Sequence, residues 1–284
     1  MEIKSLQDIS LEKLYEAFSD AFENYDVKIS KPQLERMLVR RGFVPELSFA
    51  AFDGGLLASF TLNGIGDFNG HLTAYDTGTG TRKAYQGQGL ARQIFEHSVP
   101  FLKEYGIKQY LLEVLQHNTN AISVYKKQGF EVLREFNYFV QSNESVKVSN
   151  DVHLLDFVIK EIALIDYDAV SAFWDFTPSW QNSFEAILRK PDDFHVFGAL
   201  DGDSNLLGYC VFEPVSGDVT QIAVRKDCRR KGIGSSLLLK AVGMNAFSFI
   251  KILNTDIHCE SITSFLESRN IQVTGRQFEM MRPL

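Results

Sequence analysis

The feature that most constrains this chain is a glycine-rich pattern that occurs twice. The two copies are Gln86-Gly87-Gln88-Gly89-Leu90-Ala91 and Lys231-Gly232-Ile233-Gly234-Ser235-Ser236. Each copy follows a strand-like run and precedes a helix-like run, and about half of the 284-residue chain separates them. Self-similarity at this scale predicts that a whole domain has been duplicated.

An Asp-Gly turn provides a second landmark in each half. Ala51-Phe52-Asp53-Gly54 and Ala199-Leu200-Asp201-Gly202 both end an apolar run, and another apolar run follows each of them. Asp-Gly between hydrophobic runs is a strong hairpin signal. The two turns precede the glycine patterns by similar distances. We therefore expect two domains, residues 1–141 and 151–284, joined by the polar stretch 141–150.

Composition and charge exclude several classes of protein. The 45% of hydrophobic residues can supply two cores. A net charge of −7 argues against a nucleic-acid-binding surface, which needs a basic face. The three cysteines form no Cys-x-x-Cys pair and the six histidines show no metal spacing, so neither a disulfide framework nor a metal site is expected. No apolar run has the length of a signal peptide or a membrane span, so we expect a cytoplasmic protein without a membrane partner.

Hydrophobic periodicity predicts the same order of elements in both halves. The first half reads as a strand at 2–6, a helix behind the N-cap residue Ser10, a helix opened by Ser30 and Pro32, a hairpin around Asp53, and a strand at 71–79. A helix ended by Gly106, a strand at 108–116, a helix at 120–128 and strands within 130–140 follow the glycine pattern. The second half repeats this order, with helices near 168–176 and 179–189. The expected fold class is α/β (α+β), with a mixed, mostly antiparallel sheet flanked by helices in each half.

A glycine-rich turn that opens a helix can bind an anion. Its backbone N–H groups point at one spot, where the positive end of the helix dipole adds to them. Glycine is also common in turns that bind nothing. Neither copy has the Gly-Lys-Ser/Thr of a Walker loop, and Arg92 and Leu237 stand where a dinucleotide fingerprint needs a third small residue.

The loops resemble the coenzyme A pyrophosphate loop of the GCN5-related N-acetyltransferase (GNAT) family, whose pattern is Arg/Gln-x-x-Gly-x-Gly/Ala. Arg229-Arg230-Lys231-Gly232-Ile233-Gly234 matches it in full, whereas Ala84-Tyr85-Gln86-Gly87-Gln88-Gly89 has Ala84 at the first position. The resemblance covers nearly the whole chain and implies two tandem GNAT-like domains with acetyl-CoA as co-substrate. The residues that it implies for coenzyme binding are Thr77, Thr79, Gln86, Gly87, Gln88, Gly89, Leu90, Ala91 and Asn118 in the first half, and Val224, Arg229, Lys231, Gly232, Ile233, Gly234 and Ser235 in the second.

The resemblance also implies a catalytic acid in the first half. The segment Ala121-Ile122-Ser123-Val124-Tyr125 is similar to the family segment whose tyrosine faces the coenzyme sulfur. A phenol there can protonate the departing thiolate, which is a general-acid role. An aromatic residue that simply packs on a helix is the structural alternative for Tyr125. In the second half, Phe265 is expected at this position, and its ring has no hydroxyl to donate.

Candidate bases are divided between the halves. Asp218 stands where some family members carry a basic carboxylate, and Thr73 takes that place in the first half. Asp76 and Glu113 lie on the first-half strands expected to flank the acceptor, although a carboxylate on a strand is more often only solvated. Strand alternation places Asp76 on the face opposite Thr73 unless a β-bulge intervenes, and Gly78 and Gly80 make a bulge plausible.

The sequence thus predicts an acetyl-CoA-dependent N-acetyltransferase that acts on a small-molecule or peptide amine by direct attack. The first half is the expected working site. Two alternatives stay open: the second half turns over with Asp218 as base, or the chain is a CoA-sensing or partner-binding module. The residues do not identify the acceptor or the oligomeric state.

Overall fold

The computed structural model describes residues 1–23, 28–147, 156–163 and 167–284. The chain divides into two compact units, the first made of Met1–Leu133 with Phe278–Leu284 and the second of Arg134–Gln277. These bounds differ from the expected domains 1–141 and 151–284, because residues 134–141 belong to the second unit and the last seven residues to the first. Strands β6 (Glu131–Ser142) and β12 (Val273–Pro283) each contribute residues to both units.

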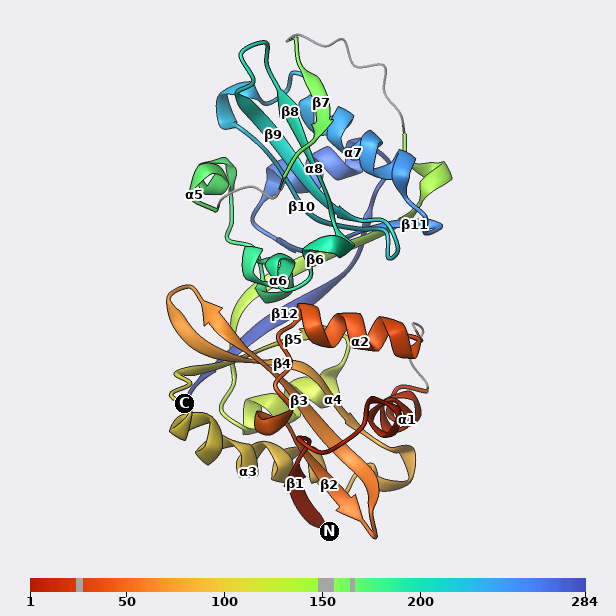
Figure 1. The fold of residues 1–284 in the computed structure, drawn as a ribbon, viewed down its shortest axis with the longest axis vertical. Coiled ribbons are helices and arrows are strands. Elements are labelled where there is room, and N and C mark those ends of the chain that lie inside the picture. Colours follow the sequence, from red (N-terminus) through yellow and green to blue (C-terminus); the bar gives the residue numbers. More distant parts are fainter. Residues whose placement is uncertain (24–27, 148–155, 164–166) are drawn as a thin grey trace. The chain divides into compact units, whose positions relative to one another are not determined.

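The first unit contains a sheet with the strand order β1-β2-β3-β4-β5. Its strands are β1 (Glu2–Ser5), β2 (Phe49–Asp53), β3 (Leu56–Phe68), β4 (His71–Thr81) and β5 (Gln109–Leu115), and its helices are α1 (Leu11–Ala21), α2 (Lys31–Arg40), α3 (Leu90–Glu104) and α4 (Thr119–Lys127) (Figure 1). Neighbouring strands run antiparallel except β4 and β5, which are parallel. The C-terminal end of the chain closes this sheet, where the amide of Leu284 donates to the carbonyl of Lys108 at 3.0 Å.

Helices cover both faces of the first-unit sheet. Phe60 and Leu62 on β3 share a core cluster with residues of α1 and α2. Ala58 on the same strand instead shares a cluster with Leu90 and Ile94 of α3. Simple alternation along a strand would put Ala58 on the face of Phe60 and Leu62. The pairing of β3 with β2 shifts at Ala58, because Ala51 pairs with Ser59 and Phe52 with Leu57, so Ala58 faces the other side.

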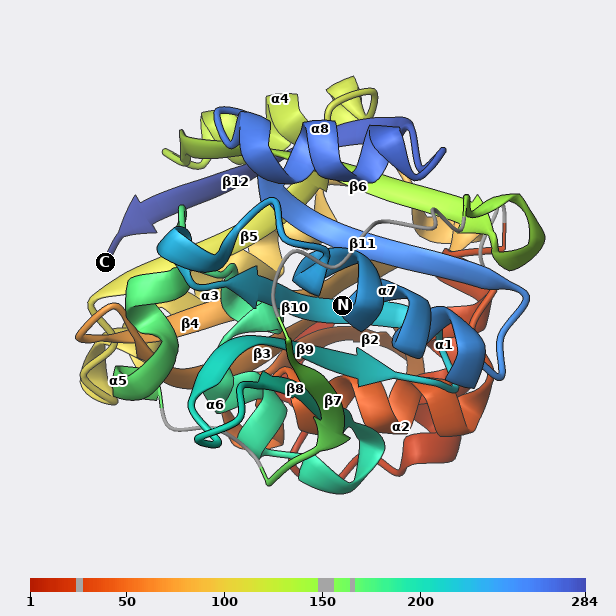
Figure 2. The same ribbon diagram turned by 90° about the horizontal axis from the view of Figure 1, so that it is seen from above.

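The second unit contains the strand order β12-β6-β11-β10-β9-β8-β7. Its further strands are β7 (Val158–Glu161), β8 (His195–Leu200), β9 (Leu206–Glu213), β10 (Asp218–Val224) and β11 (Phe249–Asp256), and its helices are α5 (Tyr167–Val170), α6 (Phe184–Leu188), α7 (Ile233–Met244) and α8 (Glu260–Ser268) (Figure 2). Core residues of α7 and α8 pack together with β11. Residues of the α5 and α6 region form a separate cluster with β8 and β9.

Most of the elements follow the sequence pattern, and three expectations need correction. The helix expected at 168–176 is only the four-residue α5 followed by a 3-10 turn, Ser171–Phe173. The helix expected at 179–189 begins as a 3-10 turn, Trp180–Asn182, before α6. Residues 141 and 142 of the expected linker lie in β6, and its residues 148–150 fall outside the described part of the chain. Among the described residues, no helix combines the length and the apolarity needed to cross a membrane.

Candidate acyl-transfer sites

The two glycine loops have the same backbone conformation. Each begins with a 3-10 turn, Lys83–Tyr85 or Lys226–Cys228, and continues through one extended residue. A left-handed residue comes next, Gly87 at φ +79° in the first unit and Arg230 at φ +63° in the second. The loop ends at a left-handed glycine that caps the following helix, which is Gly89 for α3 and Gly232 for α7.

This geometry corrects the alignment of the two loops. Gln86 and Arg229 are the equivalent extended residues, so Gln86-x-x-Gly89-x-Ala91 matches the GNAT pattern in full and Ala84 is not its first position. Both side chains bond the carbonyl of the last residue of the preceding strand: Gln86 Nε2 donates to Thr81 at 3.2 Å and Arg229 Nε to Val224 at 3.1 Å. The sequence alignment failed because Arg230 adopts the left-handed conformation that Gly87 takes.

Each loop presents the N-terminus of a long helix. The first amides of a helix have no intrahelical partner and carry partial positive charge. Neither Gly89 nor Gly232 has a side chain that could cap its helix, so no cap side chain occupies these amides. Such an arrangement suits the diphosphate of coenzyme A.

A β-bulge precedes each loop. On β4, Asp76 pairs with Asn63 and Gly78 with Leu62, so Thr77 is the extra residue. On β10, Val219 pairs with Phe212 and Gln221 with Val211, so Thr220 is the extra residue. The first-half bulge therefore follows Asp76 and does not intervene between Thr73 and Asp76, the place where it would have brought them to one face. Its counterpart in the second half supports the duplication.

In the first unit, the candidate acid lies on the wall of a cavity of about 170 Å³. The hydroxyl of Tyr125 is 3.4 Å from Oδ2 of Asp76, and the hydroxyl of Thr79 donates to the same oxygen at 2.9 Å. Burial raises the pKa of Asp76 to about 6, although the bonds from Thr79 and Tyr125 favour its charged form. Ala91, from the first turn of α3, lines the same cavity.

The two first-unit carboxylates point to opposite faces of the sheet. Asp76 is two residues beyond Ala74 on β4, so its side chain lies on the same side of the sheet, the side that α3 and α4 cover. There it contacts Tyr125. Glu113 lies between Leu112 and Val114 on β5, and both of these pack on the α3 and α4 face. Glu113 therefore faces the other side, where its charge adds to burial in raising the pKa of Tyr75. The bulge comes after Asp76, so Asp76 stays opposite Thr73.

The other first-unit candidates have structural roles of their own. Thr77 is buried, and its carbonyl accepts a hydrogen bond from Nη1 of Arg41 at 3.0 Å. Asn118 caps α4 by accepting from the amide of Ala121 at 3.2 Å. Leu90 packs in the core below α3. Only Asp76, Thr79, Ala91 and Tyr125 of the predicted site residues line the 170 Å³ cavity.

The second unit has a much larger cavity, about 910 Å³, within the usual range of ligand sites. Strands β10 and β11 make one parallel pair, Asp218 with Lys251, and residues of both strands beyond that pair line the cavity. The predicted residues on its wall are Val224, Arg229, Gly232, Ile233, Gly234 and Ser235. Lys231 instead donates to the carbonyl of Asp227 at 2.9 Å.

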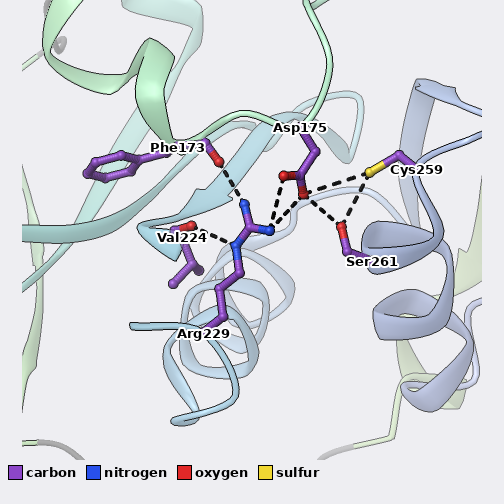
Figure 3. A network of polar contacts seen from close by, with 6 residues as sticks. All are labelled: Phe173, Asp175, Val224, Arg229, Cys259 and Ser261. Carbon is purple, nitrogen blue, oxygen red and sulfur yellow. Dashed lines mark hydrogen bonds and ion pairs between the residues drawn. The ribbon is translucent and has the colours of Figure 1, made fainter. Parts of the chain in front are cut away.

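A polar network at this cavity holds Arg229 in place (Figure 3). Its Nη1 donates to both carboxylate oxygens of Asp175, at 3.1 and 2.8 Å, and its Nη2 donates to the carbonyl of Phe173 at 2.8 Å. Ser261 of α8 donates to Asp175 at 2.8 Å, and the thiol of Cys259 lies 4.0 Å from the same oxygen. Arg229 thus joins the loop to the segment at Phe173 and Asp175 and to the end of β10.

The second unit lacks a counterpart of Tyr125. Asn118 and Cys259 cap α4 and α8, and Gly129 and Asn270 are the left-handed residues after these helices. These landmarks put Leu266, not Phe265, opposite Tyr125. Leu266 is buried in the core and has no proton to give. Asp218, the alternative base, is buried and accepts from the hydroxyl of Thr220 at 2.9 Å, and it is not among the residues that line the cavity.

Sequence reasoning missed several polar residues of the second cavity. Asp175, Asn182, Gln221 and Ser261 come from four separate segments. No motif connects them, because only long-range packing brings them together.

Comparisons with known proteins agree with this geometry. The profile of the Acetyltransferase (GNAT) family matches residues 11–130 and 159–254, which is well over half of the chain. The curated N-alpha-acetyltransferase MAK3 of Arabidopsis thaliana is 24% identical over 127 residues, or 43% of this chain. The matched part spans 66% of that relative, slightly less than two thirds of its length.

Solved structures share the fold over almost the whole chain. A tandem GNAT protein from the clavulanic acid biosynthesis pathway matches with a TM-score of 0.71 at 10% identity, covering 99% of this chain and 98% of that one. A GCN5-related N-acetyltransferase from Sphaerobacter thermophilus gives a TM-score of 0.70 at 12% identity, covering 99% and 95%. The tandem α/β architecture expected from the sequence is confirmed. The chain belongs to the acetyltransferase (GNAT) family and is an acyltransferase.

Proposed function

We propose that this protein transfers an acetyl group from acetyl-CoA to a primary amine of a small molecule or peptide, and that the first unit carries the reaction. The observation that supports this most directly is the contact of Tyr125 with Asp76 on a cavity wall shared with Ala91 of the glycine loop. The second unit has a leucine at the position of this phenol.

Coenzyme binding would rest mainly on backbone groups. The free amides at Gly89, Leu90 and Ala91 suit the diphosphate, and Gln86 holds the loop by its bond to Thr81. Gly87 and Gln88 complete the turn. The bulge at Thr77 interrupts regular pairing two residues before Thr79, which lines the cavity, and the pantetheine amides can bond to the strand there.

In the proposed reaction, the amine nitrogen attacks the thioester carbonyl, so that a C–N bond forms and the C–S bond breaks. The departing thiolate takes the proton of Tyr125, and the nitrogen releases its extra proton as the neutral amide forms, which balances the reprotonation of the phenolate. Asp76 contacts Tyr125 and Thr79 and does not lie on the side of the sheet that Glu113 faces. Its proposed role is therefore to orient the Tyr125 hydroxyl. Glu113, on the other face of β5, is the residue proposed to accept the proton of the acceptor ammonium.

The large second cavity favours a second candidate site. Its volume, the amides of α7 and the lining residues Gly234 and Ser235 are suited to coenzyme binding. In that alternative, the second unit binds acetyl-CoA and turns it over by itself. The absence of a phenol at Leu266 and the position of Asp218 away from the cavity wall favour the first unit for chemistry.

Matched substitutions separate the two sites. Ala91 and Gly234 occupy the same motif position, and neither has a positive φ. A glutamate at either place puts a carboxylate beside the diphosphate, while acidic residues in a first helical turn do not harm the helix. We expect Ala91→Glu to abolish acetylation, and we expect Gly234→Glu to remove one calorimetric acetyl-CoA site while turnover is kept.

The Tyr125→Phe variant tests the chemistry. General-acid catalysis contributes roughly 10²–10⁴-fold, so kcat should fall by about that factor with little change in acetyl-CoA affinity. Tyr105→Phe, at an exposed tyrosine beyond α3, is the control. The assay follows free CoA release with a panel of primary amines that includes peptide α-amines, because the curated relative is an N-alpha-acetyltransferase. Full activity of Tyr125→Phe, or loss of turnover in Gly234→Glu alone, would assign the chemistry to the second unit.

A further inference from the structure

A carboxylate of the protein itself is bound at the glycine loop of the second unit (Figure 3). Asp175 accepts two hydrogen bonds from Nη1 of Arg229, at 3.1 and 2.8 Å, and a third from the hydroxyl of Ser261 at 2.8 Å. Arg229 belongs to the loop that leads into α7, whose first amides suit a diphosphate. The anion that this loop holds in the structure is therefore Asp175.

The bonds of Asp175 connect the elements that follow two neighbouring strands. Strands β10 and β11 make a single parallel pair, and residues of both strands beyond it line the cavity. Arg229 is bonded to the carbonyl of Val224, the last residue of β10, and Ser261 lies in the first turn of α8, which follows β11. Asp175 binds both Arg229 and Ser261, and all three residues line the cavity.

Asp175 carries a negative charge in this position. Although burial acts to raise the pKa of Asp175, its bonds to Arg229 and Ser261 lower that pKa below the ordinary carboxyl value. The positive end of the α8 dipole also favours a carboxylate beside its first turn. A diphosphate arriving at the loop would therefore meet a like charge, and it would find the guanidinium of Arg229 already paired.

The loop of the first unit is held in a different way. Its uncharged Gln86 stands at the equivalent position and bonds a strand carbonyl. The carboxylate of Asp20 binds Arg82 and the amide of Lys83 at the start of this loop, and Asp20 is not among the residues that line the first-unit cavity. Within the described residues, a carboxylate bonded to the first residue of the glycine motif thus occurs in the second unit and not in the first.

We propose that Asp175 is an internal competitor of the coenzyme phosphates, so that acetyl-CoA enters the second unit only by displacing this carboxylate from Arg229 and Ser261. This role presupposes that the second unit binds acetyl-CoA, as put forward above, and it is independent of acetyl transfer in the first unit. Displacement frees the guanidinium of Arg229 for a phosphate, which exchanges one anion for another. The second unit therefore fills at a higher acetyl-CoA concentration than its loop alone would require.

Calorimetric titration of the full-length protein with acetyl-CoA tests this role. The Ala91→Glu substitution blocks the first-unit loop, so the second unit is measured alone in that background. There, Asp175→Ala should bind acetyl-CoA at least about tenfold more tightly, because a like charge is removed and Arg229 is released. Asp203→Ala removes the same charge from an exposed turn of the same unit and should change nothing. Adding Gly234→Glu to Asp175→Ala should abolish the tightened site.

Two further variants keep the test decisive if Asp175→Ala does not fold. Asp175→Asn keeps the shape of the side chain and removes its charge, so it should also tighten binding, and the gain should shrink at high salt. Ser261→Ala keeps the charge but removes one of its partners, so it should tighten binding by a smaller factor.

Unchanged or weaker binding in both Asp175 variants would overturn the proposal. Absence of acetyl-CoA binding in the Ala91→Glu background, with or without Asp175, would overturn it as well, and it would leave acetyl transfer by the first unit intact. A natural protein that acetylates no amine would instead count against the proposed function, and the affinities measured at the second unit would still stand.

Discussion

Arg229 and Asp175 form an ion pair at the wall of the second-unit cavity, with one guanidinium nitrogen, Nη1, 2.8 and 3.1 Å from the two carboxylate oxygens. Their side chains are 28% and 30% exposed, so solvent screens the attraction only in part. Gln86 makes the equivalent bond to a strand carbonyl in the first unit, and no carboxylate among the described residues pairs with it. The pair is therefore an addition specific to the second loop, and it ties that loop to the segment before the 3-10 turn at Trp180.

Asp175→Asn should lower stability by about 1 kcal/mol, because a partly exposed ion pair contributes about that much. Burial acts to raise the pKa of Asp175, but the bonds from Arg229 and Ser261 lower it overall. The stabilisation from the ionised Asp175 is thus fully present at pH values above the ordinary carboxyl pKa of 3.8. It is lost as the pH falls through the lower pKa that Asp175 has in the folded protein. Urea unfolding at neutral pH measures the difference, with Asp203→Asn on an exposed turn as control. A stability unchanged by Asp175→Asn would show that the pair contributes nothing.

Asp76 should make the first unit less stable as pH rises from about 4 to 6. Its pKa rises from 3.8 to about 6 on folding, so the folded state binds the proton more tightly and stability falls as that proton is lost. The shift corresponds to roughly 3 kcal/mol. Asp76→Asn cannot titrate, so its stability relative to the natural protein should increase by about that amount between these pH values. Denaturant unfolding at several pH values checks this, and Asp8→Asn, at an exposed position, should show no such trend.

Acetyl transfer in the first unit should decline below about pH 6. An ionised Asp76 accepts the hydrogen bond that orients Tyr125, and protonation weakens that acceptor. In Asp76→Asn the acidic limb of the pH profile of kcat should disappear. Adding Tyr125→Phe to that variant should then lower kcat by a smaller factor than it does in the natural protein. An acidic limb that persists unchanged in Asp76→Asn would assign it to another group, such as Glu113.

Gly87→Ala should destabilise the protein by about 1 kcal/mol, because an L residue at φ +79° is strained. An added Cβ would meet nothing within 4 Å, so the effect would come from the backbone alone. Gly202→Ala is the matched comparison, since its Cβ would also meet nothing and its φ is not in the left-handed region. That variant should be neutral or stabilising by about 0.4–1 kcal/mol. Equal effects of the two substitutions would contradict this explanation.

Local signals in the sequence predicted much of the fold. Ser10 begins α1 by accepting from the amide of Lys13, and Ser30 with Gln33 forms the capping box of α2. These contacts span three residues, so composition and periodicity suffice to identify them. The Asp53-Gly54 turn likewise connects β2 and β3 as its sequence indicates.

Features that depend on distant residues were not predictable in this way. The amino-acid sequence does not indicate that Arg230 takes a positive φ. This one backbone conformation determines which residues of the two loops are equivalent. The contact of Asp76 with Tyr125 joins positions 49 residues apart, and the pairing of Arg229 with Asp175 joins positions 54 apart. Each depends on how strands and helices pack, which a motif does not record.

The assignment of residues 278–284 to the first unit has a consequence for biosynthesis. An N-terminal domain usually folds while the ribosome is still making the next one, at about 5–20 residues per second. Here the nascent first unit has to wait until all of Arg134–Gln277 has been translated, a delay on the order of ten to thirty seconds at those rates. During that interval β5 lacks its neighbour β12, and the edge of β5 is unpaired. Early chaperone contact should therefore centre on β5.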